Sequence, residues 1–385
     1  MKRSKGILLN LLAATTGGQV TRAEAFLRRF RTYAPDIRLV IVKDRDSLPS
    51  INDADGWEVI NVHIGVGRLR ALRRAAWENW NLPQLMNSKD LNIYLTFSHY
   101  LPLFLGEEVY SIVGVSNLAP FSEEAWGVES NIVRFRMRLL RHTIISSCRR
   151  ADQVIALSNT CKSILAECSI KPLKIKVIPN GVEIFNPSAD DIQNSTLPCE
   201  SPFILSVSHF YRYKNFERLI EAFSLLPAQR LNRLRLVIVG KPYDRKYFEE
   251  IEGLIERLGL TDHVSIIAGA DRSSLDALYR NASLFVFTSL IENSPNILLE
   301  AMAYSLPIVA SNVEPMPEFG SNGVRYFKAF SAEDLADKIE IMLSDPTGVA
   351  DLRRRAKMRA DEYSWENFTK SVIEVCVSSQ KEGLQ

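Results

Sequence analysis

The stretch "TSLIENSPNILLEAMAYSLPIVAS" (residues 288–311) places two glutamates between two apolar runs. The second apolar run begins at Pro307. Ser294 is a good N-cap and Pro295 is a good first helical residue, so the pattern predicts a helix over about 295–304. The stretch therefore has the order strand, helix, strand, which is the repeating unit of a parallel α/β sheet.

Short apolar runs alternate with helical patterns along the rest of the chain. The predicted strands cover residues 6–12, 37–42, 91–98, 109–116, 151–158, 174–182, 203–208, 234–240, 264–269, 283–289 and 307–311. Segment 186–202 is polar and proline-rich and has no periodicity, which predicts a linker. We therefore expect an α/β protein with two doubly wound, Rossmann-like domains, 1–185 and 200–362. These would face a cleft at the carboxyl ends of their strands.

Bulk composition narrows the class of protein. The chain has 385 residues, of which 46% are hydrophobic and 24% charged, and this is the composition of a globular protein. A formal net charge of +2 predicts no nucleic-acid partner. The five cysteines are odd in number and form no C-x-x-C pair. Their pattern favours a reducing compartment over a disulfide framework or a thiolate metal site.

The N-terminal stretch "MKRSKGILLNLLAATTGG" allows two interpretations. Basic residues, a short apolar run and alanines resemble a signal peptide. Alternatively, "GILLNLL" is a buried first strand, and Gly17 and Gly18 lead into a helix. Asn10 interrupts the apolar run, which favours the strand, and no run approaches the length of a membrane-spanning helix. We therefore expect a cytoplasmic protein.

The two glutamates of the opening stretch suggest a nucleotide site. Free N–H groups at a helix start favour an anion such as a diphosphate. Glu300, inside the helix, could accept hydrogen bonds from two ribose hydroxyls, as acidic residues do in dinucleotide sites. Glu292, in the preceding loop, could reach hydroxyls on whatever extends from the diphosphate. The alternative is that both are surface carboxylates near the helix dipole.

Six segments, in order, resemble the retaining GT-B glycosyltransferases of the large family-four group: "TTGG", "ADQVIALSNTCKSILAE", "KIKVIPNGVEIFNP", "FILSVSHFYRYKNFERLIEAF", "LVIVG" and "LDALYRNASLFVFTSLIENSPNILLEAMAYSLPIVASNVEPMPE". The resemblance implies that Glu292 contacts the donor sugar and Glu300 the ribose. It also implies that residues 363–385 form a C-terminal helix that returns to the first domain. The donor-binding residues it implies are Gly17, Gly18, Ser208, His209, Arg212, Lys214, Ser294, Pro295, Asn296, Ile297 and Glu300.

Two departures from the family pattern affect the site. The family has Gly-Arg where this chain has Ser208 and His209, although Lys214 is kept. Arg212 could supply the missing cation, since a guanidinium suits phosphate oxygens, but it could equally be a solvated loop residue. The family's first-domain His-Asp pair is replaced by Ser116-Asn117. His99, upstream of that pair, could do polar work at the cleft or be structural.

The implied reaction is transfer of a hexose from a UDP- or GDP-sugar to a glycan or lipid-linked acceptor, in cell-surface polysaccharide or lipopolysaccharide synthesis. Catalysis would rest on Glu292, Lys214, Arg212 and His99, with retained configuration and no metal or other cofactor. "KDRD" (43–46) resembles a metal-binding D-x-D but lies early in the chain. The alternative function is a non-catalytic nucleotide-sugar-binding subunit.

Two basic segments, 67–80 and 134–150, interleave arginine with tryptophan, leucine and isoleucine. This pattern suits helices that lie on an anionic membrane surface, and it also suits a solvated basic face. We therefore expect a cytoplasmic enzyme that could bind peripherally to the membrane.

Overall fold

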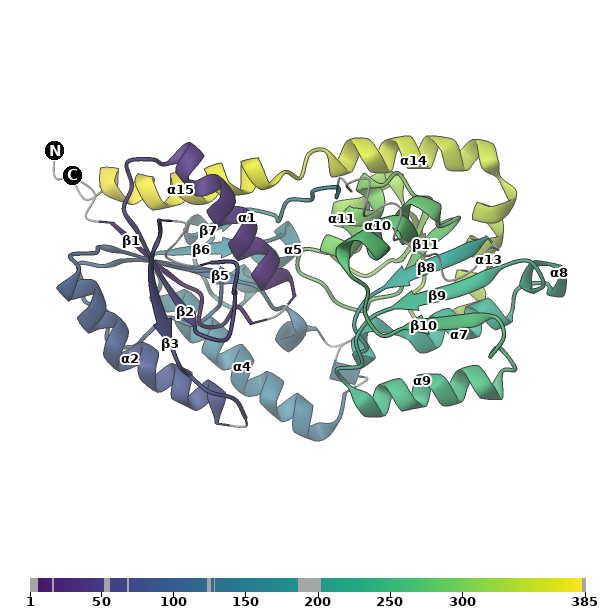
Figure 1. Cartoon of the computed structure of the whole chain (residues 1–385), viewed down its shortest axis with the longest axis horizontal. Helices are drawn as coiled ribbons and strands as arrows, with labels where there is room; N and C mark the ends of the chain where they lie inside the picture. Colours follow the sequence, from purple (N-terminus) through teal and green to yellow (C-terminus); the bar gives the residue numbers. More distant parts are fainter. Residues whose placement is uncertain are drawn as a thin grey trace. The chain divides into compact units, whose positions relative to one another are not determined.

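The computed structural model describes residues 6–15, 17–51, 56–67, 69–122, 126–127, 129–185 and 202–382. The chain divides into two compact units (Figure 1). Unit 1 comprises Met1–Phe121, Phe135–Gly181 and Ser364–Gln385, and unit 2 comprises Ser122–Arg134 and Val182–Tyr363. Most of the predicted linker 186–202, and Arg68 in the first basic segment, lie outside the described residues.

Unit 1 is built on a seven-stranded parallel sheet in the order β3-β2-β1-β4-β5-β6-β7. Its strands are β1 (Ile7–Asn10), β2 (Leu39–Asp44), β3 (Glu58–Val62), β4 (Ile93–Thr96), β5 (Tyr110–Val115), β6 (Gln153–Ala156) and β7 (Ile175–Val177). Its helices are α1 (Gly18–Tyr33), α2 (Arg70–Ser88), α4 (Asn131–Arg150, which starts in unit 2), α5 (Asn159–Glu167) and α15 (Trp365–Glu382), with short 3-10 turns at Ala119–Phe121 and Pro172–Lys174.

The C-terminal helix α15 is part of the core of unit 1. It packs beside α1 on one face of the sheet, whereas α2 and α4 lie on the other face (Figure 1). Trp365, Phe368 and Val372 are buried in the cluster that also contains Phe26 of α1. Because α15 supplies buried aromatic side chains to this cluster, it contributes to the stability of unit 1.

Unit 2 has a six-stranded parallel sheet in the order β10-β9-β8-β11-β12-β13. Its strands are β8 (Phe203–Val207), β9 (Arg235–Val239), β10 (Val264–Ile267), β11 (Leu284–Phe287), β12 (Ile308–Ser311) and β13 (Arg325–Phe327). Its helices are α7 (Phe216–Ser224), α8 (Ala228–Leu231), α9 (Arg245–Arg257), α10 (Arg272–Asn281), α11 (Asn296–Ala303), α12 (Met316–Gly320), α13 (Ala332–Ser344) and α14 (Pro346–Ala360), with 3-10 turns at Arg212–Lys214 and Ser321–Gly323. Residues of α7, α9 and α13 fill one core cluster, and residues of α10, α11 and α14 fill the other.

Both sheets have the strand order of a dinucleotide-binding fold, with the order reversing between β1 and β4 in unit 1 and between β8 and β11 in unit 2. At such a reversal, neighbouring strands send their following loops to opposite sides, which leaves a crevice at the carboxyl ends. The loops after β8 and β11 contain Lys214 and Glu292, and the loop after β4 contains His99. The fold thus directs the candidate residues to the positions where open α/β sheets bind ligands.

The structure corrects the sequence prediction at three places. Strands β3 and β13 were not predicted, and both are edge strands. The helix expected over 295–304 begins at Asn296, so its N-cap is Pro295 and not Ser294. A proline side chain cannot accept a hydrogen bond, so no side chain at the N-cap position satisfies the first turn.

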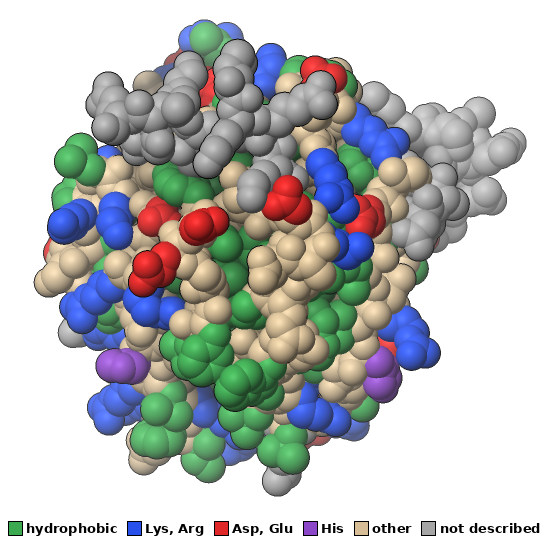
Figure 2. All heavy atoms as spheres, turned by 90° about the vertical axis from the view of Figure 1, so that its left-hand side faces the viewer, with side chains coloured by type: hydrophobic (Ala, Val, Ile, Leu, Met, Phe, Trp, Pro, Cys, Tyr) green, Lys and Arg blue, Asp and Glu red, His purple; other side chains and the backbone are tan. Residues whose placement is uncertain are grey.

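Four cysteines fall within the described residues (Cys148, Cys161, Cys168 and Cys376), and none of these four forms a disulfide. None of the helices in the described ranges combines the length and hydropathy that a membrane crossing requires. Large hydrophobic side chains do reach the surface of unit 1. Figure 2 shows them grouped with lysine and arginine on the end face of that unit.

Candidate donor-binding site

The candidate site is formed by the two loops that follow β8 and β11. Backbone and side-chain hydrogen bonds hold them together, since the amide of Leu290 donates to the carbonyl of Tyr213 (2.8 Å) and Thr288 Oγ1 donates to the carbonyl of Lys214 (2.7 Å). Asn215, in the left-handed region with φ 57°, ends the first loop and donates to the carbonyl of Ala329 (2.8 Å). The backbone that carries Lys214 is therefore fixed on both sides.

Lys214 and Glu292 form an ion pair in this site. Lys214 Nζ lies 2.5 Å from Glu292 Oε1, and the two side chains are largely buried, with 12% and 17% of their surfaces exposed. The ammonium also lies over the rings of Tyr213 and Phe287, at 5.0 Å and 5.9 Å from their centroids. The structure thus brings together two of the four residues that we expected to be catalytic.

Glu300 lies one turn inside α11 and is held by Tyr279 of α10. Tyr279 Oη donates to Glu300 Oε2 (3.0 Å), and Tyr279 itself is buried against Tyr304. Burial raises the pKa of Glu300 to about 7, although the hydrogen bond from Tyr279 and the charge of Arg272 oppose the rise. Its carboxylate is therefore oriented before any ligand binds and titrates near neutral pH.

The start of α11 lies between the two glutamates. Asn296 is the first helical residue, Ile297 follows it, and the amide of Leu299 donates to the carbonyl of Pro295 (3.0 Å). The first turn of any helix has N–H groups without partners inside the helix, and the helix dipole adds a partial positive charge there. This end of α11 is suited to a phosphate group.

Ser208 and His209, which replace the family's Gly-Arg, occupy the turn after β8. Gly240 faces Ser208 so closely that an added Cβ would lie 1.8 Å from the Ser208 carbonyl oxygen, so only glycine fits there. His209 Nδ1 accepts a hydrogen bond from the amide of Lys241 (3.2 Å), which leaves the proton of a neutral ring on Nε2. Burial and the charges of Lys214 and Lys241 lower the pKa of His209, so this histidine is a neutral donor rather than a replacement cation.

Arg212 is engaged elsewhere in the structure. Its two terminal nitrogens bind both carboxylate oxygens of Glu250 on α9, at 2.7 Å and 2.8 Å, and its Nε lies 3.8 Å from Asp244. A fork-to-fork pair of this kind uses one N–H of each terminal nitrogen and places a carboxylate counter-ion beside the guanidinium. Lys241, which is not among the predicted site residues, is an exposed cation next to His209. Its position in "VGKP", shortly after a strand, is the sequence signal for it.

The remaining candidates belong to unit 1. Gly17 precedes α1 with a φ of 61°, where a glycine is favoured, and Gly18 is the first residue of that helix. His99 follows β4, and burial, with the charge of Arg74, lowers its pKa to about 4. Ser116 accepts a hydrogen bond from buried Arg22 (2.8 Å) and donates one to the Phe97 carbonyl, which is a structural arrangement.

The "KDRD" segment forms an acidic cluster in unit 1. Ligand atoms of Asp44, Asp46 and His63 lie within 4.8 Å of one another. Arg70 already binds Asp44 (2.7 Å), and Asp46 and His63 are exposed. We assign no metal to this cluster.

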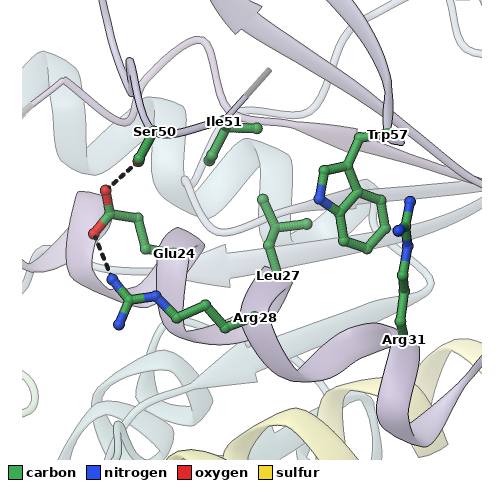
Figure 3. A pocket seen from close by; sticks show the side chains of 7 residues that line it. All are labelled: Glu24, Leu27, Arg28, Arg31, Ser50, Ile51 and Trp57. Carbon is green, nitrogen blue, oxygen red and sulfur yellow. Dashed lines mark hydrogen bonds and ion pairs between the residues drawn. The ribbon is translucent and has the colours of Figure 1, made fainter. Parts of the chain in front are cut away.

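A pocket of about 330 Å³ opens between α1 and the segment before β3 (Figure 3). The guanidinium of Arg31 stacks on Trp57 at 4.1 Å, and Glu24 binds Ser50 and Arg28. The pocket contains none of the candidate residues.

Family profiles match both halves of the chain. Residues 188–363 match the glycosyl transferases group 1, and residues 16–184 match glycosyltransferase family 4. One relative, the serotype-specific mannosyltransferase WbdA of Escherichia coli, is 30% identical over 240 residues, which are 60% of this chain and 29% of WbdA. The chain spans less than two thirds of the length of the first curated relatives that it matches.

Solved structures share the fold over nearly the whole chain. A sucrose-phosphate synthase from Thermosynechococcus elongatus superposes with a TM-score of 0.75 at 18% identity, covering 98% of this chain and 99% of that one. HepE from Anabaena, in complex with UDP and glucose, gives a TM-score of 0.74 at 18% identity, covering 97% and 99%. The two family profiles confirm the expected family, and the two parallel sheets with the similar solved structures confirm the expected fold. The chain belongs to the group 1 glycosyltransferases of family four and has the GT-B fold of two Rossmann-like domains.

Proposed function

We propose that this protein is a retaining, metal-independent hexosyltransferase that moves a hexose from a UDP- or GDP-sugar to a glycan or lipid-linked acceptor. The observation that supports it most is the Lys214–Glu292 pair beside the start of α11, with Glu300 one turn deeper. The names of similar proteins point the same way, since HepE was solved with UDP and glucose and WbdA is a mannosyltransferase.

In the proposed reaction, Lys214 and the amides at the start of α11 hold the diphosphate while negative charge develops on it. Glu300 holds the ribose and Glu292 contacts the sugar. The bond from the sugar's anomeric carbon to the diphosphate oxygen breaks, and a bond to the acceptor oxygen forms on the same face. The acceptor's proton passes to the departing diphosphate, so no separate base is needed. The configuration is retained because the new bond forms on the face that the diphosphate leaves.

The direct test is transfer from a panel of UDP- and GDP-hexoses to a membrane extract, with and without EDTA. We expect one donor to raise the melting temperature, since ligand at 100 times its Kd stabilises the folded state by about 2.7 kcal/mol. That donor should also label the extract, equally well in EDTA, and with unchanged anomeric configuration. Loss of transfer in EDTA would contradict the metal-free mechanism.

A second candidate function is a nucleotide-sugar-binding subunit without catalysis. The observation that favours it is the Arg212–Glu250 pair, which removes the cation expected to assist Lys214. Donor binding without any transfer in the panel above would support this alternative.

We also propose that α2 carries a membrane-binding surface. Leu69 is the N-cap of α2, and Leu72 and Trp80 lie at helical spacing from it within the helix. The three side chains are 62%, 68% and 63% exposed. Phe104 extends this stripe, with its ring 4.9 Å from that of Trp80, and exposed Arg73 lies within it. In α4, exposed Phe135 and Leu139 make a similar surface. Apolar side chains beside arginine suit the headgroup region of an anionic bilayer.

Replacing Leu72 and Trp80 together with serine is expected to reduce binding to anionic vesicles roughly tenfold, because two exposed apolar side chains can no longer enter the bilayer. The measurement is vesicle co-sedimentation at low and high salt, and salt should weaken binding by the wild type. Leu173→Ser is the matched control, since Leu173 is 93% exposed at a 3-10 turn of unit 1 outside the stripe. Equal binding of the wild type to neutral and anionic vesicles would count against the surface.

A further inference from the structure

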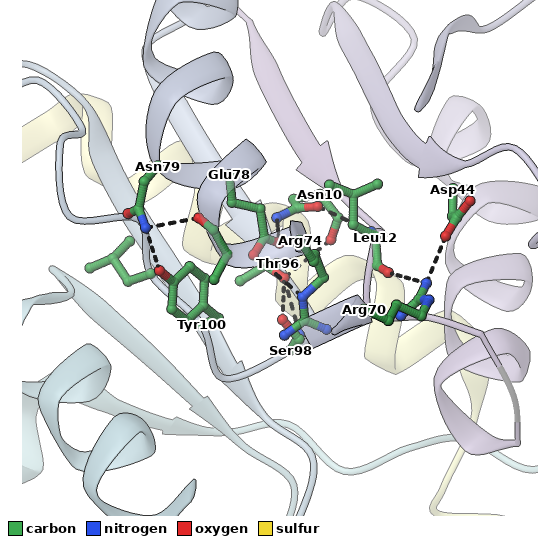
Figure 4. Close-up of polar contacts among 12 residues, drawn as sticks. Asn10, Leu12, Asp44, Arg70, Arg74, Glu78, Asn79, Thr96, Ser98 and Tyr100 are labelled. Carbon is green, nitrogen blue, oxygen red and sulfur yellow. Dashed lines mark hydrogen bonds and ion pairs between the residues drawn. The ribbon is translucent and has the colours of Figure 1, made fainter. Parts of the chain in front are cut away.

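Polar side chains gather at the strand-order reversal of unit 1, between β1 and β4 (Figure 4). Asn10, the last residue of β1, donates to Glu78 Oε1 of α2 (2.8 Å) and to Tyr94 Oη of β4 (2.9 Å). Thr96, which ends β4, donates to the carbonyl of Asn10 (3.1 Å). The same carboxyl edge that binds ligands in open α/β sheets is therefore polar here, although its strands are otherwise apolar.

Glu78 is the unusual member of this group because its side chain is fully buried. Burial raises its pKa, and the charge of Arg74, one helical turn earlier, opposes the rise. Arg74 Nε lies 3.4 Å from Glu78 Oε2, and neither atom has a hydrogen-bond partner among the described residues. A buried charge pair with such incomplete hydrogen bonding contributes little to the free energy of unfolding, so stability alone does not explain the pair.

The ion pair with Glu78 orients the guanidinium of Arg74. Glu78 contacts Arg74 through Nε, and within the described part of the chain nothing accepts a hydrogen bond from the two terminal nitrogens of Arg74. The neighbouring arginines of α2 differ in this respect. Arg70 binds Asp44 and the carbonyl of Leu12, and Arg73 binds the carbonyl of Val66.

His99 adds a second polar group beside this guanidinium. Its Nδ1 is buried without a hydrogen-bond partner in the described ranges, and its ring is close enough to Arg74 to feel that charge. At neutral pH the imidazole carries no charge, so it does not repel Arg74. Together they provide one positive fork and one neutral polar ring at the carboxyl edge of the sheet, which suits an anionic group attached to a hydroxylated molecule.

We propose that the terminal nitrogens of Arg74 bind an oxyanion, a phosphate or a carboxylate, on the acceptor, and that Glu78 is the positioning residue that orients Arg74. The inference rests on the proposed function, since it assigns an acidic acceptor to the same transferase. It also gives His99 a role as a neighbour of the acceptor's charged group. The oxyanion could be a sugar phosphate or the carboxylate of a uronic acid, and both offer two oxygens to the fork.

The test compares Glu78→Gln with the double variant Glu78→Gln/Arg74→Gln. Both lose the buried carboxylate, so neither leaves it without a partner, and glutamine can still accept the hydrogen bond from Asn10. Ligand-detected NMR measures the binding of glucose 6-phosphate, of glucuronate and of glucose to each protein. Saturating nucleoside diphosphate is present to occupy the donor site. We expect an acidic sugar to bind Glu78→Gln about threefold more weakly than the wild type, because Arg74 is then less well oriented, and to bind the double variant about tenfold more weakly than Glu78→Gln, because the guanidinium is gone.

Arg73→Gln is the matched control, and it should bind the acidic sugars as the wild type does. A response to glucose 6-phosphate alone identifies a phosphate, and a response to glucuronate alone identifies a carboxylate. Equal binding of acidic sugars to the single and double variants, or equal binding of glucose, would overturn the proposal. Binding of the nucleoside diphosphate is measured separately and tests the proposed function itself. If the nucleoside diphosphate does not bind, the proposed transferase activity is contradicted, but the anion site on Arg74 is not.

Discussion

Lys214→Gln is expected to lower kcat for sugar transfer by roughly 100- to 1000-fold, as loss of one group that stabilises developing charge does elsewhere. It should also weaken binding of the nucleoside diphosphate, because the cation contacts phosphate before the reaction begins. In the free protein Lys214 neutralises Glu292 at 2.5 Å. The substitution therefore does two things at once: it removes a cation and leaves a largely buried carboxylate facing the diphosphate.

The double variant Lys214→Gln/Glu292→Gln separates these two effects. It should bind the nucleoside diphosphate more tightly than Lys214→Gln does, because the repulsive carboxylate is gone. Glu292→Gln alone should bind it at least as well as the wild type while transferring sugar about 100-fold more slowly, since its contact serves the sugar and the transition state. The measurements are calorimetric binding beside transfer kinetics for all four proteins. If Glu292→Gln transfers at the full rate, the glutamate is only a counter-ion for Lys214.

Physical reasons explain which strands could be predicted. The central strands of both sheets are buried on two faces, so they appear in the sequence as continuous apolar runs such as "LVIV". The two missed strands lie at sheet edges. Strand β3, "EVINV", is mostly half-buried, and β13, "RYF", has only three residues. An edge strand needs apolar side chains on fewer positions, so neither run stands out from a loop.

For the site residues, the position of the backbone could be predicted from the sequence, but the partners of the side chains could not. Backbone positions follow from the fold, so the sequence could predict that Lys214 and Glu292 lie on loops at one edge of a sheet. Side-chain partners distant in sequence could not be predicted. Arg212 has its counter-ion 38 residues away on α9, and no local pattern reveals that Glu250 would reach it. Asn10 is visible in the sequence as an interruption of an apolar strand, but its partner Glu78 lies 68 residues later.

Glu300→Ala is expected to weaken nucleoside diphosphate binding by roughly tenfold to a hundredfold, because a lost hydrogen bond to a charged group is worth about 1.5 to 3 kcal/mol. The same loss should appear for the intact donor, since the proposed contact is to the ribose that both ligands share. Calorimetry of the nucleoside diphosphate measures it. Binding equal to that of the wild type would show that the ribose lies elsewhere.

The pH dependence gives this assignment a second, independent readout. The pKa of Glu300 is about 7 in the free protein, and ribose hydroxyls that donate to the carboxylate favour its charged form. Binding should therefore lower that pKa and release a proton, so affinity is greatest above pH 7 and declines as the pH falls through 7. Glu300→Gln still accepts the hydrogen bond from Tyr279 but cannot ionise, so its affinity should lack this component. The phosphate groups of the ligand titrate in the same range for both proteins, and the ratio of the two affinities removes their contribution. A ratio that stays constant from pH 6 to pH 8.5 would mean that the Glu300 carboxylate does not contact the nucleotide.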